Sequence, residues 1–210
     1  MLIKDAIDSF GTLNHMSYAF GSAKFRQDHN FDIVLFLTEK KLCDETCKGH
    51  KKLTGVANFE GACGDSRTVQ LGLTHGLAIV QDFGAFSGVD TAAHQIGRLL
   101  GAKDDGDNNP CSSDDGYIMS NLRTKKSLSK GNAYKFSKCS VKSIKIFLKT
   151  SQAKTCLFTD PNLFSSYRTL SWRELVAPRV PSLGDQCSVS KTPDGMVWYN
   201  RTAICIIVTA

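Results

Sequence analysis

Residues 91–105 read TAAHQIGRLLGAKDD, and this stretch decides the fold class of the chain. Four apolar or small residues recur at i, i+3, i+4 and i+7, the spacing of one face of a helix: Ala93, Ile96, Gly97 and Leu100. Ser87 and Gly88 precede the pattern, and Gly101 follows it. A glycine in this place commonly ends a helix in the left-handed conformation. The stretch therefore predicts a helix with a sharp turn after it.

This helix carries the spacing of a zinc peptidase motif. Such a site needs two imidazoles one turn apart as ligands, and a Glu beside the first to deprotonate the metal-bound water. The extended form, HExxHxxGxxH, adds a glycine, a third ligand and a methionine turn downstream. Here the motif reads HQIGRLLGAKD, with His94 as first ligand. The base position holds Gln95, the other two ligand positions hold Arg98 and Asp104, and Met119 suits the methionine turn.

These substitutions predict an impaired site. Gln95 has no ionisable group and cannot accept a proton from water, whereas general-base assistance is commonly worth about 10²–10⁴-fold. Arg98 stays protonated and offers only donors, so it cannot bind a metal. Asp104 remains an acceptable zinc ligand. We expect Arg98 to occupy the vacated metal position and to pair with Asp104, and His94 to be a neutral histidine hydrogen-bonded in the old cleft.

The rest of the chain indicates an α/β (α+β) fold. Residues 2–26 have loosely helical spacing, and residues 31–38 form a near-continuous apolar run, as in a strand buried on both faces. Further extended segments are expected at 53–59 and 69–80, and a helix at 140–150 with Val141, Ile144 and Leu148 on one face. Prolines crowd the region after Cys156, which predicts a linker and a small disulfide-dependent module.

The composition excludes a membrane-spanning protein and shows an uneven distribution of charge. The chain has 210 residues, 41% of them hydrophobic, and no apolar run near the roughly 20 residues that cross a bilayer. Residues 122–154 contain ten Lys or Arg and no acid, whereas residues 104–115 contain five Asp and no base. The basic stretch indicates either an anionic partner or a solvated helix face. No nucleic-acid-binding motif accompanies it.

The cysteines favour an extracellular protein. Eight in 210 residues is a high and even number, typical of a disulfide-stabilised chain outside the cytosol. Asn200-Arg201-Thr202 is a glycosylation sequon. The first residues do not have the pattern of a signal peptide, so we expect a mature portion or a fragment of a longer protein.

Several motifs in order resemble one family. They are the 32–38 strand, the cysteines at 43 and 47, TGVA at 54–57, GAC at 61–63, TAAH at 91–94, GYIMS at 116–120 and FSKCS at 136–140. Together they resemble the reprolysin type of metzincin metalloprotease, as in ADAM-TS catalytic domains and arthropod salivary or venom metalloproteases. The resemblance implies a mixed sheet with an active-site helix and a methionine turn.

The resemblance also implies a domain organisation. Residues 1–156 correspond to the peptidase domain, without a counterpart of the family's opening strand–helix–strand. Residues 157–210 correspond to a linker and the start of a disintegrin-like segment, because GDQC at 184–187 resembles its opening. Family members bind extended peptide beside an edge strand, which here corresponds to Gly55, Val56 and Ala57.

The resemblance finally implies a set of disulfides. The pairs are Cys43–Cys47, Cys63–Cys156 and Cys111–Cys139, which leaves Cys187 with Cys205. Closing each of the two long loops stabilises a fold by about 3–5 kcal/mol in the chain-entropy model.

Three functions remain open from the sequence. The first is a secreted member of the zinc metalloendopeptidase family that is catalytically impaired, has lost zinc or binds it weakly, and binds extracellular proteins or peptides. The second is an active zinc endopeptidase that hydrolyses extracellular proteins. The third is a basic module that binds sulfated glycans.

Overall fold

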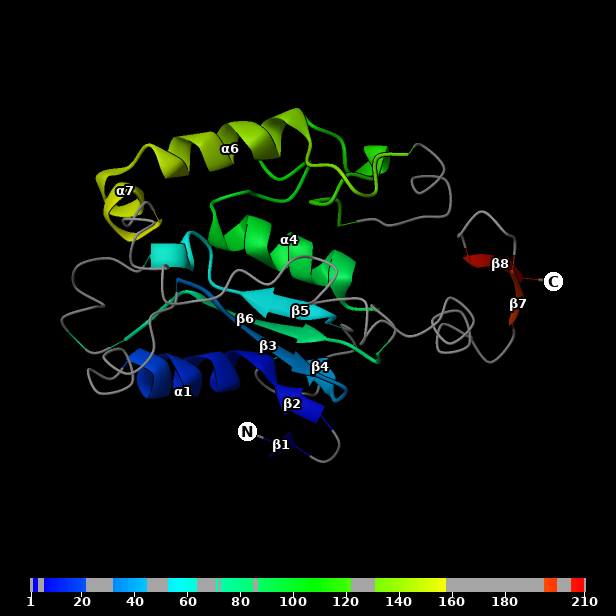
Figure 1. The fold of residues 1–210 in the computed structure, drawn as a ribbon, viewed down its shortest axis with the longest axis horizontal. Coiled ribbons are helices and arrows are strands. Elements are labelled where there is room, and N and C mark those ends of the chain that lie inside the picture. The colour runs from blue at the N-terminus through cyan, green and yellow to red at the C-terminus, as the bar shows by residue number, and fades with distance from the viewer. Residues whose placement is uncertain are drawn as a thin grey trace, which may run out of the picture. The chain divides into compact units, whose positions relative to one another are not determined.

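A computed structural model gives the fold, and it describes residues 2–3, 6–21, 32–44, 53–63, 71, 73–84, 87–121, 131–157, 195–199 and 205–209 (Figure 1). The chain divides into two compact units. The first consists of residues 1–81 and 88–159, and the second of residues 82–87 and 160–210. The predicted site helix and the Met119 turn both belong to the first unit.

A mixed sheet lies at the centre of the first unit. Its strands are β3 (Val34–Thr38), β5 (Gly55–Ala57) and β6 (Leu77–Gln81), in the order β3-β6-β5. The middle strand β6 is parallel to β3 and antiparallel to β5. Every residue of β6 is buried, as expected for a strand with neighbours on both sides. The mixed sheet with flanking helices agrees with the fold class that the sequence predicts.

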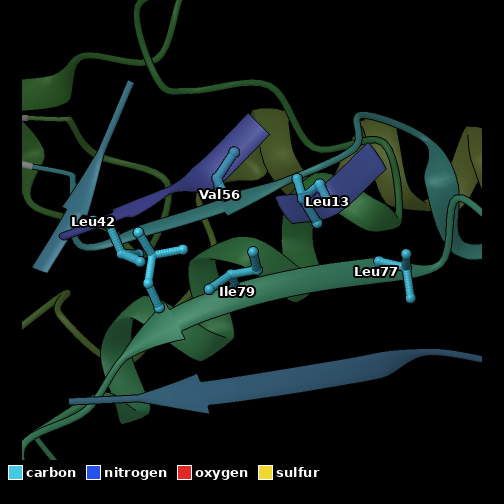
Figure 2. Close-up of a cluster of buried hydrophobic side chains, with 6 residues drawn as sticks. Leu13, Leu42, Val56, Leu77 and Ile79 are labelled. Atoms are coloured by element: carbon cyan, nitrogen blue, oxygen red, sulfur yellow. The ribbon is translucent and has the colours of Figure 1, made fainter. Parts of the chain in front are cut away.

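One helix packs on each face of this sheet (Figure 1). They are α1 (Ser9–Gly21) and α4 (Val89–Leu99). Successive side chains of a strand point to opposite faces, so alternate residues of β6 serve the two helices. Leu77 and Ile79 pack with Leu13 of α1 (Figure 2), whereas Ala78 packs with Leu99 of α4.

A second small sheet contains β1 (Leu2–Ile3), β2 (Ala6–Asp8) and β4 (Lys41–Cys43), in the order β1-β2-β4. Strand β2 is antiparallel to β1 and parallel to β4. The expected helical stretch at 2–26 is thus wrong for its first residues. The helix begins only at Ser9, because Asp8 Oδ1 accepts a hydrogen bond from Gly11 N at 3.0 Å and caps the first turn.

Two further helices of the first unit are α6 (Lys138–Leu148) and α7 (Ser151–Leu157). Ser137 caps α6 by accepting from Ser140 N at 3.1 Å, and Thr150 Oγ1 accepts from Ala153 N at 3.1 Å. Phe147 of α6 and Ala153 of α7 are buried in the cluster that contains Leu99. Short 3₁₀ turns, η1 (Gly61–Cys63) and η2 (Ser113–Asp115), lie between the longer elements.

The second unit contains β7 (Gly195–Tyr199) and β8 (Cys205–Thr209), which form an antiparallel pair with Val197 opposite Ile207. Cys187 and Asn200 lie outside the described residues, so the Cys187–Cys205 disulfide and the sequon stay predictions. Within the described parts of the chain, no helix is both long and apolar enough to span a bilayer.

The strand at 34–38 differs from its prediction. The apolar run predicts burial on both faces, but Phe36 is 41% and Leu37 is 54% exposed. The reason is its position, since β3 stands at an edge of the described sheet and pairs there with β6 alone. The segment expected at 69–80 is regular strand only from Leu77 onward, and residues 64–70 and 72 lie outside the described residues.

Candidate functional site

The site is built on α4 and on the turn that ends it. The helix spans Val89–Leu99, as the sequence predicts. Gly101 adopts a φ of 85°, and its backbone N–H donates to the Arg98 carbonyl at 3.0 Å. Ala102 N donates to the Gly97 carbonyl at 2.8 Å. This left-handed reversal turns the chain back along the helix and brings Asp104 beside it.

Arg98 and Asp104 form the ion pair that the sequence predicts. Arg98 Nη1 lies 3.2 Å from Asp104 Oδ1. The same carboxylate oxygen lies 3.2 Å from His94 Nε2. The side chains of His94 and Asp104 are each 17% exposed and that of Arg98 is 32% exposed, so the cluster is only partly shielded from solvent. The three motif positions thus converge on one carboxylate oxygen.

The second ring nitrogen of His94 also has a partner. His94 Nδ1 lies 2.9 Å from the backbone carbonyl of Ile118. A carbonyl only accepts, so Nδ1 carries a proton and donates. A hydrogen bond from Nε2 to Asp104 then needs protons on both ring nitrogens, and such an imidazolium has no lone pair for a metal. The prediction that His94 is hydrogen-bonded is confirmed, and its partners are both a backbone carbonyl and the Asp104 carboxylate.

The surroundings keep Asp104 ionised. Burial alone would raise the pKa of the Asp104 carboxyl. The hydrogen bond and positive charge of His94, together with Asn121 and Arg98, outweigh burial and hold this pKa below its ordinary value of 3.8. Asn109 Nδ2 donates to the Asp104 backbone carbonyl at 2.8 Å and fixes the loop that carries the side chain. Asp104 is therefore held as an anion beside the Arg98 guanidinium and the His94 ring.

The side chain of Gln95, on α4, faces the edge strand β5. It is 6% exposed, and its Oε1 has no hydrogen-bond partner among the described residues. A Cβ on Gly55 would come within 2.6 Å of Thr91 Cγ2 and 3.1 Å of Gln95 Cγ. The strand backbone thus passes close to the helix only because residue 55 has no side chain. The predicted base position and the predicted edge strand are neighbours.

Met119 lies under α4 in a tight turn. It is fully buried, and Ser120 N closes the turn by donating to the Tyr117 carbonyl at 3.0 Å. A Cβ on Gly97 would come within 2.8 Å of Met119 Sδ. Asp105 N donates to the Met119 carbonyl at 2.9 Å. The structure therefore brings the predicted methionine turn to the helix that carries His94.

The donor set does not fit a catalytic zinc ion. Such an ion takes three protein ligands and one water. The cluster offers His94 and Asp104 as donors of electron pairs, whereas the third member, Arg98, is a cation with N–H donors only. Its positive charge also opposes a dication at this place. Within the described residues, no three or more His, Cys, Asp or Glu side chains gather as a metal site.

One predicted disulfide is confirmed, Cys111–Cys139, with a Cα–Cα distance of 6.1 Å. Cys43 and Cys63 are both disulfide-bonded. Their expected partners, Cys47 and Cys156, lie outside the residues whose side chains are described, so these pairings stay predictions.

Sequence reasoning missed several supporting groups. The hydrogen bond from His94 to the Ile118 carbonyl could not be predicted from the sequence, because every residue has a backbone carbonyl. Asp105 is 2% exposed and accepts a hydrogen bond from Ser137 Oγ at 2.6 Å; burial outweighs this bond and raises the pKa of its carboxyl. Gly97 did leave a signal, since an isolated glycine within a helical pattern often marks close packing.

Comparison with known proteins gives the class of the chain. Residues 7–161 match the model of the reprolysin (M12B) family zinc metalloproteases. A silkworm (Bombyx mori) protein called "a disintegrin and metalloproteinase with thrombospondin motifs like" is 35% identical over 177 residues, which are 76% of this chain and 23% of that protein. Human "a disintegrin and metalloproteinase with thrombospondin motifs 18" is 31% identical over 68% of this chain and 10% of its own length.

A venom metalloproteinase from the wasp Eulophus pennicornis is 28% identical over 67% of this chain and 30% of its own length. The chain belongs to the reprolysin family of zinc metalloproteases. It spans less than a third of the length of each of these relatives.

Proposed function

We propose that this chain is a secreted reprolysin-family protein that has lost efficient peptide hydrolysis and acts by binding extracellular proteins or peptides. The observation that carries the proposal is the convergence of His94 and Arg98 on one oxygen of Asp104, each at 3.2 Å. The residues at the three ligand positions therefore contact one another, and the Arg98 guanidinium among them cannot bind a metal.

The chemistry of the neighbouring position supports the same conclusion. Hydrolysis needs a base beside the first ligand, and Gln95 is an amide that accepts no proton near neutral pH. Asp104 cannot take over this role, because its pKa is lowered and its carboxylate pairs with the Arg98 guanidinium. Asp105 forms a buried hydrogen bond with Ser137 on the far side of the turn. Neither carboxyl replaces the missing base.

Peptide binding does not need this chemistry. Among the described strands, β5 stands at the edge of the central sheet and pairs with β6 alone, and it runs beside α4. An edge strand offers backbone N–H and C=O groups to an extended peptide. We therefore infer that a protein segment lies along the open edge of Gly55–Ala57, the strand that Gln95 packs against.

Secretion is part of the proposal. Cys43, Cys63, Cys111 and Cys139 are all disulfide-bonded, which suits an oxidising environment. The wasp relatives are named as venom proteins.

A specific distance favours a second function, an active zinc endopeptidase. His94 Nε2 and Asp104 Oδ1 lie 3.2 Å apart, close to the roughly 3.3 Å between two tetrahedral ligands that each stand about 2.0 Å from one zinc ion. Displacement of Arg98 into solvent would free this pair.

The zinc-to-protein ratio of the oxidised chain, after equilibration with zinc and desalting, separates the two functions. We expect a ratio near zero for the wild type and for His94→Ala. A wild-type ratio near one that is lost in His94→Ala would overturn the proposal. An extended peptide that still binds the zinc-free chain, and is not cleaved, completes the support.

A further inference from the structure

Away from the His94–Arg98–Asp104 cluster, the outer face of α6 carries a groove lined by lysines and apolar residues. The groove has a volume of about 570 Å³ and is lined by Phe136, Lys138, Val141, Lys142, Lys145, Ile146 and Lys149. The four lysines are exposed, and none of them is in an ion pair among the described residues. No acidic side chain lines the groove. In Figure 1, α6 lies on the opposite side of α4 from the sheet.

The spacing of the lysines destabilises the helix by charge repulsion. They stand at i, i+4, i+7 and i+11, so neighbours are one turn apart on one face and repel each other by a few tenths of a kcal/mol per pair. The helix contains no acid to offset them. Lys138 also stands in the first turn, where a cation opposes the helix dipole. Stability of the free chain therefore does not explain this row, whereas binding of an anion would relieve it.

The floor of the groove is apolar, which decides the chemistry of the anion. Val141 is 39% and Ile146 is 60% exposed, and Phe136 lies beside them. Of the three residues predicted to share one face, Ile144 and Leu148 pack against core clusters, whereas Val141 lines the groove. A sulfated glycan carries charge but no apolar side chain to cover these residues.

The geometry points to an acidic peptide segment with apolar side chains as the occupant of this groove. Its carboxylates pair with the lysine row, about 16 Å long, and its apolar side chains cover Val141 and Ile146. The helix is held for this purpose at its first turn by the Cys111–Cys139 disulfide and near its end by buried Phe147. The inference does not depend on whether the site at His94 hydrolyses peptides.

Fluorescence anisotropy with the oxidised full chain tests this assignment. The probe is a labelled twelve-residue peptide of Glu and Leu, and the matched probe has Ser in place of each Leu. We expect the Glu/Leu peptide to bind more tightly than the Glu/Ser peptide, and its binding to weaken with salt. Lys142→Ser with Lys145→Ser should weaken binding about tenfold, because two charge contacts are lost.

Two further variants separate the groove from general charge. Val141→Ser with Ile146→Ser should weaken the Glu/Leu peptide about five- to tenfold and leave the Glu/Ser peptide unchanged. Lys40→Ser with Lys41→Ser removes the same charge from exposed positions at β4 and should change nothing. Circular dichroism checks that each variant is folded. Equal losses in both lysine pairs, or equal affinity for the two peptides, would overturn the inference. So would tight binding of a heparin oligosaccharide or phosphatidylserine vesicles that needs Lys142 and Lys145 while the Glu/Leu peptide fails to bind.

Discussion

At the scale of single residues, Arg98 decides whether the site on α4 can bind zinc. It stands one helical turn from His94, where a second imidazole would complete a metal site. Its guanidinium instead lies 3.2 Å from Asp104 Oδ1, and this carboxylate also meets His94 Nε2. Arg98 thus replaces one metal ligand, and its guanidinium pairs with Asp104, which could serve as another. A reversal of this single change is therefore informative.

Arg98→His should increase zinc binding. The new imidazole lies four residues from His94, and the loss of the guanidinium frees Asp104 as a third ligand. We expect the zinc-to-protein ratio to rise toward about one, measured by atomic emission after desalting. Arg98→Gln is the control, since it removes the charge without adding a ligand. Hydrolysis should stay low until Gln95→Glu is added, which we expect to raise it by about 10²–10⁴-fold. Equal zinc content in both Arg98 variants would contradict this account.

Asp104 should make stability depend on pH. Its folded-state pKa is held below the ordinary value of 3.8, so the ionised form stabilises the fold above that pH. The contribution is lost as pH falls through the lowered pKa. Asp104→Asn should cost about 1–3 kcal/mol near neutral pH, and the difference from the wild type should shrink below about pH 4. Urea unfolding of chelator-treated protein across this range measures it. A difference that is constant with pH would refute the ionic origin.

At the scale of elements, the contact between α4 and the Met119 turn depends on Gly97. Alanine is a better helix former by about 1 kcal/mol, yet its Cβ would come within 2.8 Å of Met119 Sδ and 2.9 Å of Phe136 Cε1. We expect the steric clash to outweigh the gain in helix propensity, so that Gly97→Ala destabilises the chain by about 1–3 kcal/mol in urea unfolding. Met119→Ala makes room, so the double variant should lose less than the two single losses added together. Strict additivity would contradict the proposed clash.

The Cys111–Cys139 disulfide ties the first turn of α6 to the acidic loop. It spans 28 residues, and closing a loop of this length stabilises a fold by about 3–4 kcal/mol in the chain-entropy model. Replacing both cysteines by Ser should lower the free energy of unfolding by about this amount. The urea midpoint measures the loss, with the wild type under the same oxidising conditions as reference. A loss below about 1 kcal/mol would show that the loop is already ordered by its hydrogen bonds.

At the scale of the whole molecule, some features could be predicted from the sequence and others could not. The site helix was predictable because its periodicity, Gly101 and the motif spacing agree. The Arg98–Asp104 pair was predictable because opposite charges stood at positions that the family brings together. The exposure of Phe36 and Leu37 was not, since an apolar run does not reveal which strand is at an edge.

Helix α7 was also missed, and it affects where the first unit ends. The sequence predicted a last helix over residues 140–150 and a linker after Cys156, but Thr150 caps a further helix. Its Ala153 is fully buried, and Leu157 packs against the cluster that contains Leu99 and Phe147. The hydrophobic clusters of the described residues all lie between residues 7 and 157.

Truncation tests this boundary. A chain that ends at Thr159 keeps α7 and all three clusters, so we expect its urea midpoint to match that of the full chain. A chain that ends at Thr150 keeps α6 but loses Ala153, Leu157 and Cys156. We expect it to lose about 3 kcal/mol or more, because a buried surface of the core is exposed and any disulfide to Cys156 is gone. Equal stability of the two truncated chains would show that α7 contributes nothing, and a marked loss on ending at Thr159 would show that the first unit needs the rest of the chain to fold.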